Sequence, residues 1–500
     1  MAILEVLAPD ITWQSPWKSL WATSNHSVPL AFSRRTTRKG RVAHPRHIAV
    51  VTRATSSREK EEALEQTKRS TWFDWNSEWY PVAIEQELDK GVPHAVTILG
   101  NELVVWWDRN GKNWQVFSDK CPHRLAPLSE GRIAENGHIQ CSYHGWMFAP
   151  GTGSCSRIPQ AQPGDLSVRL SPRACATVYP SMEQQGILWM NFSASASSQI
   201  KPPFFPVLED ADFVHYWATS DVPYGYEALI ENLMDPTHVP FAHHKLQGNR
   251  NKTGPVSYTV NKFDRHGFKG STGRGDVVFM PPLSFVMEIR IPPKQKVLSK
   301  LSSKLEESDK ITYTVFMCVP VLPGRSKAFW SFPRNFAKSI HFYTPRWLAH
   351  LRHMLVLDSD LYLLHIMEQK QERNEREFTP TSADAFVLGF RRWLSVYAGG
   401  APGYAPHIDR KLPSSPPKPQ LMDRYENHVK RCPTCMAALR SFKLAELGLQ
   451  IAAIATVAVA SIRRSWWGIL GVFLWIASRY TARFIRKNYH FHDYNHALVK

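Results

Sequence analysis

Two cysteine–histidine pairs constrain this chain more than any other feature of its sequence. They read Cys121-Pro-His123 and Cys141-Ser-Tyr-His144, separated by the 17 residues 124–140. Two thiolates and two imidazoles are the ligands of those [2Fe–2S] clusters in which histidines bind one of the irons. A tetrahedral zinc ion also accepts two cysteines and two histidines, but zinc fingers pair cysteine with cysteine. The spacing therefore predicts one [2Fe–2S] cluster per chain, held by these four residues.

A second set of metal-ligand residue types lies further along the chain, at Asp235, His238, His243 and His244. A non-haem ferrous site uses two histidines and one carboxylate and leaves positions open for other ligands. His238 and His243 can converge only if a helix deforms between them, as Pro240 would require. Asp235 is three residues before His238 and could face it from the same helix. His244 could serve equally well as the second histidine.

The cysteine–histidine pairs match Rieske domains residue for residue, and the likeness extends over residues 73–500. The flanking stretches resemble the plant and cyanobacterial Rieske oxygenases that act on chlorophyll-related tetrapyrroles; they are residues 125–131 and 143–148. This resemblance implies that His238 and His243 bind a mononuclear Fe(II). It also implies a homotrimer in which Asp235 links a ligand histidine to His144 of a neighbouring subunit, an outer contact that would fix the tautomer of the ligand.

The third iron ligand should be a carboxylate from a later segment. Asp358 and Asp360 lie in an apolar, helix-compatible stretch at residues 351–373. Comparison with the related oxygenases favours Asp360, with Asp358 as the alternative. Either aspartate could instead cap the helix, a common role for this residue type.

The resemblance implies a ferredoxin-dependent monooxygenase that uses O2 to oxidise a tetrapyrrole. Some stretches resemble the protochlorophyllide-dependent, translocon-associated members of the family, which implies oxidation of a protochlorophyllide or chlorophyllide methyl group to formyl; they include 104–109, 356–360 and 490–496. Others resemble pheophorbide a oxygenase, which implies ring opening; they include 135–143 and 171–175. A non-catalytic, redox-sensing translocon subunit is the alternative from another class.

The first 54 residues have the composition of an organelle transit peptide. Residues 11–58 contain no Asp or Glu, are rich in Arg, Ser and Thr, and contain no apolar secretory core. We expect cleavage near residues 51–54 and a chloroplast location, in the inner envelope or thylakoid membrane with the catalytic domains facing the stroma. A retained basic tail is the alternative. Because much of the net charge of +18 lies here, it does not indicate a nucleic-acid partner.

The C-terminal region combines a thiol motif with apolar segments. Cys432 and Cys435 form a single C-x-x-C, which favours a redox switch that thioredoxin could reduce. The alternative is a structural metal site completed by His428 and a second subunit. The runs 444–462 and 465–478 are apolar, and we expect a two-helix membrane anchor over 444–485. One span followed by an interfacial helix is the alternative.

These features predict an α+β chain with several parts. The expected parts are a transit peptide at 1–54, an antiparallel β Rieske domain at 72–194, a helix-grip-like α+β iron domain at 204–411, a C-x-x-C segment at 421–440 and the anchor at 444–485. Short strands at 95–99, 103–107 and 114–117 are separated by the turn formers Gly100-Asn101 and Asn110-Gly111.

Overall fold

A computed structural model describes residues 73–162, 166–193, 201–291, 310–373, 375, 377–463 and 466–499. These residues belong to one compact unit that begins at Phe73. The expected transit peptide at 1–54 and residue 72, the expected start of the Rieske domain, lie outside the described residues.

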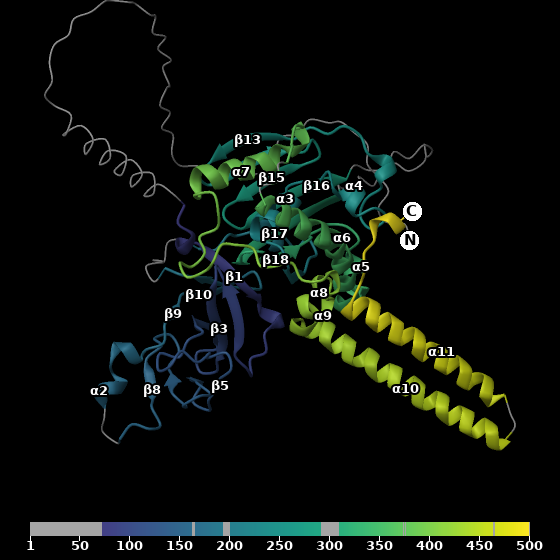
Figure 1. Cartoon of the computed structure of the whole chain (residues 1–500), viewed down its shortest axis with the longest axis horizontal. Coiled ribbons are helices and arrows are strands. Elements are labelled where there is room, and N and C mark those ends of the chain that lie inside the picture. Colours follow the sequence, from purple (N-terminus) through teal and green to yellow (C-terminus); the bar gives the residue numbers. More distant parts are fainter. Residues whose placement is uncertain are drawn as a thin grey trace, which may run out of the picture. The chain divides into compact units, whose positions relative to one another are not determined.

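The N-terminal domain is built from small antiparallel sheets, as predicted (Figure 1). One sheet has the order β2-β3-β4-β9, with β2 at His94–Ile98, β3 at Asn101–Asp108, β4 at Asn113–Ser118 and β9 at Val178–Tyr179. The strands expected at 95–99, 103–107 and 114–117 are therefore present, within a residue or two at each end. The β2–β3 turn uses the left-handed conformation at Leu99 and Gly100, which glycine adopts without steric cost.

Two further sheets complete this domain. The first has the order β1-β11-β10, with β1 at Trp79–Ile84, β10 at Ser181–Gln184 and β11 at Ile187–Asn191. Every residue of β1 and β11 is buried, because this sheet packs into the main core. The second has the order β5-β6-β7-β8 in the two-residue strands Arg132–Ile133, Ile139–Gln140 and Met147–Phe148 and the three-residue strand Cys155–Arg157.

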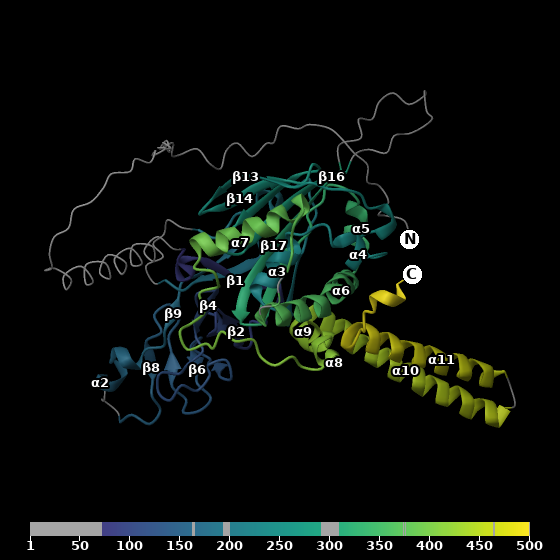
Figure 2. The ribbon, with the colours of Figure 1, turned by 45° about the horizontal axis from the view of Figure 1, so that its top comes forward.

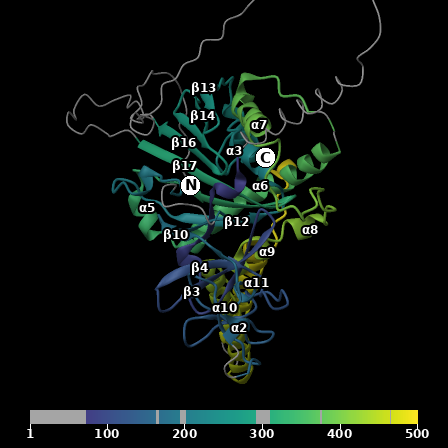
Figure 3. The same ribbon diagram turned by 90° about the vertical axis from the view of Figure 1, so that its left-hand side faces the viewer.

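The second domain is an antiparallel seven-stranded sheet of order β12-β18-β17-β16-β15-β14-β13. Its strands are β12 Trp217–Val222, β13 Thr259–Asp264, β14 Gly267–Ser271, β15 Asp276–Met280, β16 Ser284–Ile291, β17 Lys310–Leu322 and β18 Arg325–Ser331. Helices α3 (Tyr226–Leu233), α6 (Arg346–Glu372) and α7 (Ala385–Tyr397) gather on one side of this sheet (Figure 3). The second domain therefore combines a β-sheet with α-helices, as predicted for this part of the chain.

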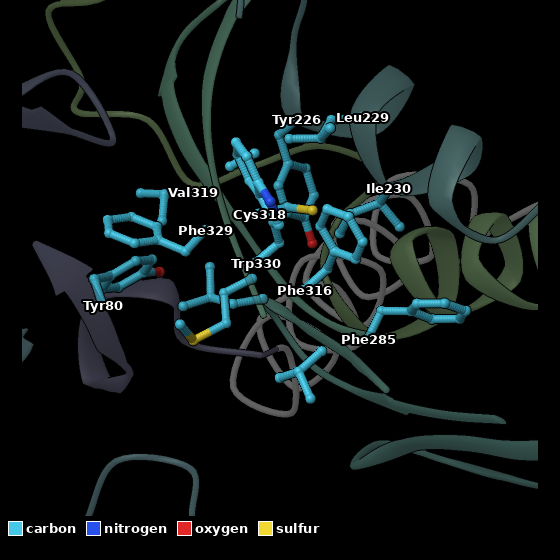
Figure 4. Close-up of a cluster of buried hydrophobic side chains, with 14 of the residues drawn as sticks. Tyr80, Tyr226, Leu229, Ile230, Phe285, Phe316, Cys318, Val319, Phe329 and Trp330 are labelled. Carbon is cyan, nitrogen blue, oxygen red and sulfur yellow. The ribbon is translucent and has the colours of Figure 1, made fainter. Parts of the chain in front are cut away.

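Aromatic side chains from both domains share one core (Figure 4). Tyr80 of β1 and Trp330 of β18 are both almost completely buried. At the β2–β3 turn, the backbone N–H groups of Leu99 and Gly100 donate to Pro320 and to residue 321 of β17, at 2.8 Å each. The two domains are thus joined by apolar contacts and by backbone hydrogen bonds.

Short helices connect these parts. They are α2 Leu166–Arg169, α4 Val239–Ala242, α5 Lys338–Tyr343, α8 Lys418–Leu421 and α9 Arg424–Asn427, with single turns at η1 Trp75–Ser77, η2 Glu85–Glu87, η3 Pro172–Ala174, η4 Pro206–Leu208, η5 Arg250–Lys252, η6 Ser382–Asp384, η7 Val429–Arg431, η8 Arg486–His490 and η9 His496–Leu498.

The C-terminal region forms two helices that lie side by side (Figures 1 and 2). They are α10 (Pro433–Arg463) and α11 (Trp467–Ile485). Among the described residues, one helical segment, Pro433–Ile462, is long and apolar enough to cross a membrane, with a mean hydropathy of 1.7. The predicted pair of helices is present, while the prediction that α11 also spans the membrane has no such support.

Candidate functional site

The two cysteine–histidine pairs lie on a pair of matched loops, residues 121–126 and 141–146, here called the cluster loops. In the first, the N–H of Cys121 donates to Ala126 and the N–H of Leu125 donates back to Cys121. The second repeats this pattern, with the N–H of Cys141 donating to Trp146 and the N–H of Gly145 donating to Cys141. Leu125 and Gly145, the fourth residue after each cysteine, have positive φ angles of 59° and 74°. The matched loops bring His123, the second residue after Cys121, close to His144, the third residue after Cys141.

The cluster loops separate their sulfur and nitrogen ligands by burial. Cys121 and Cys141 are 2% and 1% exposed within a small apolar core, and burial raises the pKa of Cys121 to about 11. His123 and His144 are half-buried, with ring centres 4.6 Å apart. His123 stacks on Trp146 at 4.7 Å. The two imidazoles thus lie near the surface and the two thiols lie beneath them. This arrangement matches a [2Fe–2S] cluster in which the cysteines bind one iron and the histidines bind the other.

The second group of metal-ligand residues also converges. His238 precedes the single turn of α4 and His243 follows it, so the two imidazoles flank one helical turn. Their Nε2 atoms are 3.2 Å apart. The Oδ2 atom of Asp360, from the middle of α6, lies 3.7 Å from Nε2 of His238 and 3.2 Å from Nε2 of His243. We call these three residues the histidine–aspartate triad.

Pro240 and Gly248 set the local shape of α4. Pro240 occupies the first turn of α4, where its missing N–H costs nothing. Gly248 passes so close to this turn that a Cβ atom would lie 2.5 Å from the Cα of Pro240. The side chains of His238 and His243 converge because the chain forms a separate short helix between them. The sequence predicted such a deformation at Pro240.

Neighbouring groups orient both imidazoles of the triad. The hydroxyl of Ser359, adjacent to Asp360 in the chain, lies 2.7 Å from Nδ1 of His243. That hydroxyl itself donates to the carbonyl of residue 356 at 2.6 Å. Nδ1 of His238 is hydrogen-bonded to the backbone carbonyl of Asp235. In each ring the Nδ1 contact leaves Nε2 facing the other members of the triad, as in a metal-binding histidine held by an outer partner.

Two alternative ligands lie outside this triad. Asp358 forms a buried ion pair with Arg424, which leaves Asp360 as the carboxylate beside the histidines. Nδ1 of His244 accepts a hydrogen bond from the backbone N–H of Arg250 at 3.2 Å. Because both Asp358 and Asp360 lie in the middle of α6, the alternative that either aspartate caps this helix is wrong.

Asp235 is not on the same helix as His238, contrary to our expectation. Helix α3 ends at Leu233 and Asp235 lies between α3 and α4, because a residue before proline, here Pro236, is disfavoured in the helical conformation. The carboxylate of Asp235 accepts a hydrogen bond from the backbone N–H of Thr237 at 2.8 Å. Its other oxygen lies 3.9 Å from Nδ1 of His238 and the side chain is 30% exposed.

The C-x-x-C cysteines are both free thiols and both buried. They lie beside two buried histidines, His428 and His350. We call these four residues the cysteine–histidine tetrad. The sequence pointed to His428 together with a second subunit as completing a metal site, but it gave no signal for His350 of the same chain. Ser359 and Arg424 were also missed; Ser359 could have been found from its position between the two candidate aspartates.

A cavity of about 620 Å³ lies away from the triad. None of His238, His243 and Asp360 lines it. Its polar lining is basic, with Arg334, Arg346, Arg352 and three histidines.

Comparisons with known proteins agree with this arrangement. Residues 78–180 match the Rieske [2Fe–2S] domain and residues 279–377 match the pheophorbide a oxygenase domain. The chain is 38% identical to the chloroplastic protochlorophyllide-dependent translocon component 52 of Arabidopsis thaliana, over 95% of both chains. It is 37% identical to the chloroplastic flavonoid 8-hydroxylase 2 of Ocimum basilicum, over 90% of this chain and 91% of that protein.

A solved structure has the same fold. Dicamba monooxygenase bound to 3,6-dichlorosalicylic acid aligns with a TM-score of 0.51 at 21% identity, over 65% of this chain and 98% of the other.

Proposed function

The chain belongs to the Rieske non-haem iron oxygenases whose second domain is of the pheophorbide a oxygenase type, and on this basis we propose that it is a membrane-anchored monooxygenase of chlorophyll-related tetrapyrroles. Enzymes of this family take electrons from ferredoxin-type donors and use O2. The observation that carries the proposal is the convergence of the histidine–aspartate triad within 4.8 Å, in the same compact unit as the cluster loops.

The residues present fit both metal groups. Nδ1 of His123 is buried without a hydrogen-bond partner among the described residues, as expected of an atom whose partner is an iron of the cluster. We assign Cys121, His123, Cys141 and His144 as cluster ligands, and His238, His243 and Asp360 as ligands of the mononuclear iron. When bound, the cluster supplies single electrons and the mononuclear iron supplies the activation of O2.

The chain itself then contributes the orientation of the ligands. Ser359 and the carbonyl of Asp235 hold the two imidazoles with their Nε2 atoms inward. We assign Asp235 as the residue that links His238 to a histidine of a neighbouring subunit's cluster loops, in a homotrimer. Its partly exposed carboxylate, near Nδ1 of His238, is suited to such a contact.

The first substrate to test is a protochlorophyllide or chlorophyllide, with a methyl group oxidised to formyl. This conversion takes two hydroxylations, each consuming one O2, two electrons and two protons and releasing one water; loss of a further water from the hydrate leaves the aldehyde. Opening of the pheophorbide ring is the second candidate, favoured by the match at residues 279–377. Hydroxylation of a flavonoid is the third, favoured by the relative of that name at 37% identity.

The proposed location is a chloroplast membrane, with the catalytic domains on the stromal side. Both named plant relatives are chloroplastic. Helix α10 provides the apolar span, and large apolar side chains of α10 and α11 are exposed, including Ile454, Ile462, Phe473 and Trp475. A non-catalytic redox sensor at the protein translocon is the alternative, and the relative named as a translocon component favours it.

The test uses the purified full chain with both iron groups loaded. Reduced ferredoxin and 18O2 are supplied with protochlorophyllide, chlorophyllide, pheophorbide and a flavone in separate reactions. Products are reduced at once with borohydride, because an aldehyde oxygen exchanges with water. We expect 18O in one tetrapyrrole product. Label found only in the flavone product would mean that the substrate is a flavonoid and not a tetrapyrrole. No label in any compound would refute the enzyme proposal in favour of the redox sensor.

A further inference from the structure

The cysteine–histidine tetrad joins three residues of one short segment to a histidine that is far from them in the sequence. His350 belongs to α6, His428 follows α9, Cys432 precedes α10, and Cys435 lies in the first turn of α10. One potential ligand atom from each of them lies within 4.8 Å of the others. The tetrad is separate from the triad and from the cluster loops, so it has no part in the proposed reaction.

Both sulfurs face the two imidazoles. Nδ1 of His350 lies 3.4 Å from Sγ of Cys432 and 3.5 Å from Sγ of Cys435. Nε2 of His428 lies 3.3 Å from Sγ of Cys435. Two sulfur and two nitrogen donors therefore surround one point, and their number and type match a tetrahedral Cys2His2 zinc site.

A backbone contact fixes the tautomer of His428. Its Nδ1 lies 2.9 Å from the carbonyl oxygen of Thr219 in β12. A carbonyl can only accept, so Nδ1 carries the proton and donates. Nε2 then presents its lone pair toward Cys435, which is the orientation that a backbone carbonyl imposes on metal-binding histidines.

Burial argues against the thioredoxin-reducible switch that the C-x-x-C motif alone favours. Cys432 and Cys435 are 2% and 0% exposed, and His350 and His428 are 0% and 3% exposed. Apolar side chains enclose the tetrad, among them Leu351, Leu439 and Tyr489. Thiol–disulfide exchange needs the attacking thiolate to reach a sulfur, and an external protein thiol has no such access here.

We propose that His350, His428, Cys432 and Cys435 bind a structural zinc ion. All four positions of the tetrahedron are filled by protein, which is the arrangement of structural rather than catalytic zinc sites. The ion joins the first turn of α10 to α6 and, through His428 and Thr219, to the seven-stranded sheet. It thus fixes the base of the helical pair to the domain that carries the triad.

The direct test measures metal in the full-length protein in detergent, after dialysis against EDTA. We expect one zinc ion per chain in addition to the irons. Zinc K-edge X-ray absorption should give two sulfur neighbours at about 2.3 Å and two nitrogen neighbours at about 2.0–2.1 Å. Absence of zinc, a shell without sulfur, or a Cys432–Cys435 disulfide in protein alkylated without reduction would each overturn the proposal.

Two variants and two matched controls identify the ligands. Cys435→Ala and His350→Ala should each lose the zinc and keep the spectrum of the [2Fe–2S] cluster. Cys175→Ala, a half-buried cysteine elsewhere, and His353→Ala, one turn further along α6, should keep the zinc. Zinc retained in both ligand variants would overturn the assignment. If a variant does not fold, the zinc K-edge X-ray absorption of the unmodified protein still decides whether the zinc has two sulfur and two nitrogen ligands.

Discussion

The histidine–aspartate triad and the cysteine–histidine tetrad each take one residue from helix α6, Asp360 and His350. These two residues are about 15 Å apart along the helix axis. The triad offers three hard or intermediate donors, and His238 is 20% exposed. The tetrad offers four donors, two of them sulfur, and none of its residues is more than 3% exposed.

The two proposals thus place two kinds of metal chemistry on one helix. Three protein ligands leave positions for O2 and substrate, whereas four leave none. Thiolates favour zinc, and the two-histidine-one-carboxylate set favours ferrous iron. The number, type and exposure of donors therefore separate a site for reaction from a site for stability within one compact unit.

Removal of Asp360 should have the largest effect. In Asp360→Ala the proposed mononuclear iron site loses the only carboxylate of the triad. We expect iron binding there and turnover to fall by more than about 100-fold, since loss of even an outer partner costs about 10–100-fold. Iron analysis and product formation measure this, with the cluster spectrum as the control for folding. An active variant with full iron would show that another carboxylate is the ligand.

The neighbouring Asp358 should behave in the opposite way. Asp358→Asn leaves the Arg424 guanidinium buried without its carboxylate partner. We expect a loss of about 3 kcal/mol in the free energy of unfolding, with iron content unchanged. Chemical denaturation in detergent and metal analysis measure the two quantities. A loss of iron without a loss of stability would reverse the roles assigned to the two aspartates.

Ser359 lies between them and should affect the iron more weakly than Asp360 does. Ser359→Ala removes the hydroxyl beside Nδ1 of His243. We expect Fe(II) affinity to fall by about 10–100-fold, with turnover recovered at high Fe(II). Titration of iron-depleted protein tests this. Unchanged affinity would mean that the packing around His243 alone orients its ring.

Glu368 is a partly buried acid of α6 and should give the smallest effect on the metal sites. Burial raises its pKa from 4.5 to about 7, although the N–H of Gly225 opposes this. The folded state therefore holds a proton that the unfolded chain has lost, and stability falls as pH rises from about 4.5 through about 7.

Glu368→Gln should remove this dependence, because glutamine keeps an acceptor for Gly225 without a charge. We expect the variant to gain roughly 2–3 kcal/mol over the unmodified protein between pH 5 and pH 8, at about 1.4 kcal/mol for each pKa unit. Unfolding curves at both pH values measure it. Parallel pH profiles for the two proteins would show that Glu368 does not carry the effect.

Local patterns in the sequence predicted much of this structure. Strands β2, β3 and β4 and most of α6 follow from short-range spacing, and the cluster loops follow from two short motifs. The convergence of His238 and His243 also follows locally, because Pro240 lies between them.

The remaining features depend on residues distant in the sequence. Asp358 is distinguished from Asp360 by Arg424, 66 positions away. The C-x-x-C motif acquires its proposed role only from His350, 82 positions before Cys432. Neither contact has a local signal, since helix periodicity does not specify which distant side chain a buried residue meets. The position of Asp235 was predictable, because the following Pro236 already disfavours a continuous helix.

The most direct test of the two-site account is one measurement of iron and zinc in three proteins: the unmodified chain, Asp360→Ala and Cys435→Ala. We predict that Asp360→Ala loses the mononuclear iron but keeps the cluster irons and the zinc. Cys435→Ala should lose the zinc and keep all of the iron. Loss of both metals in either variant, or of neither in both, would contradict the assignment of two separate sites served by one helix.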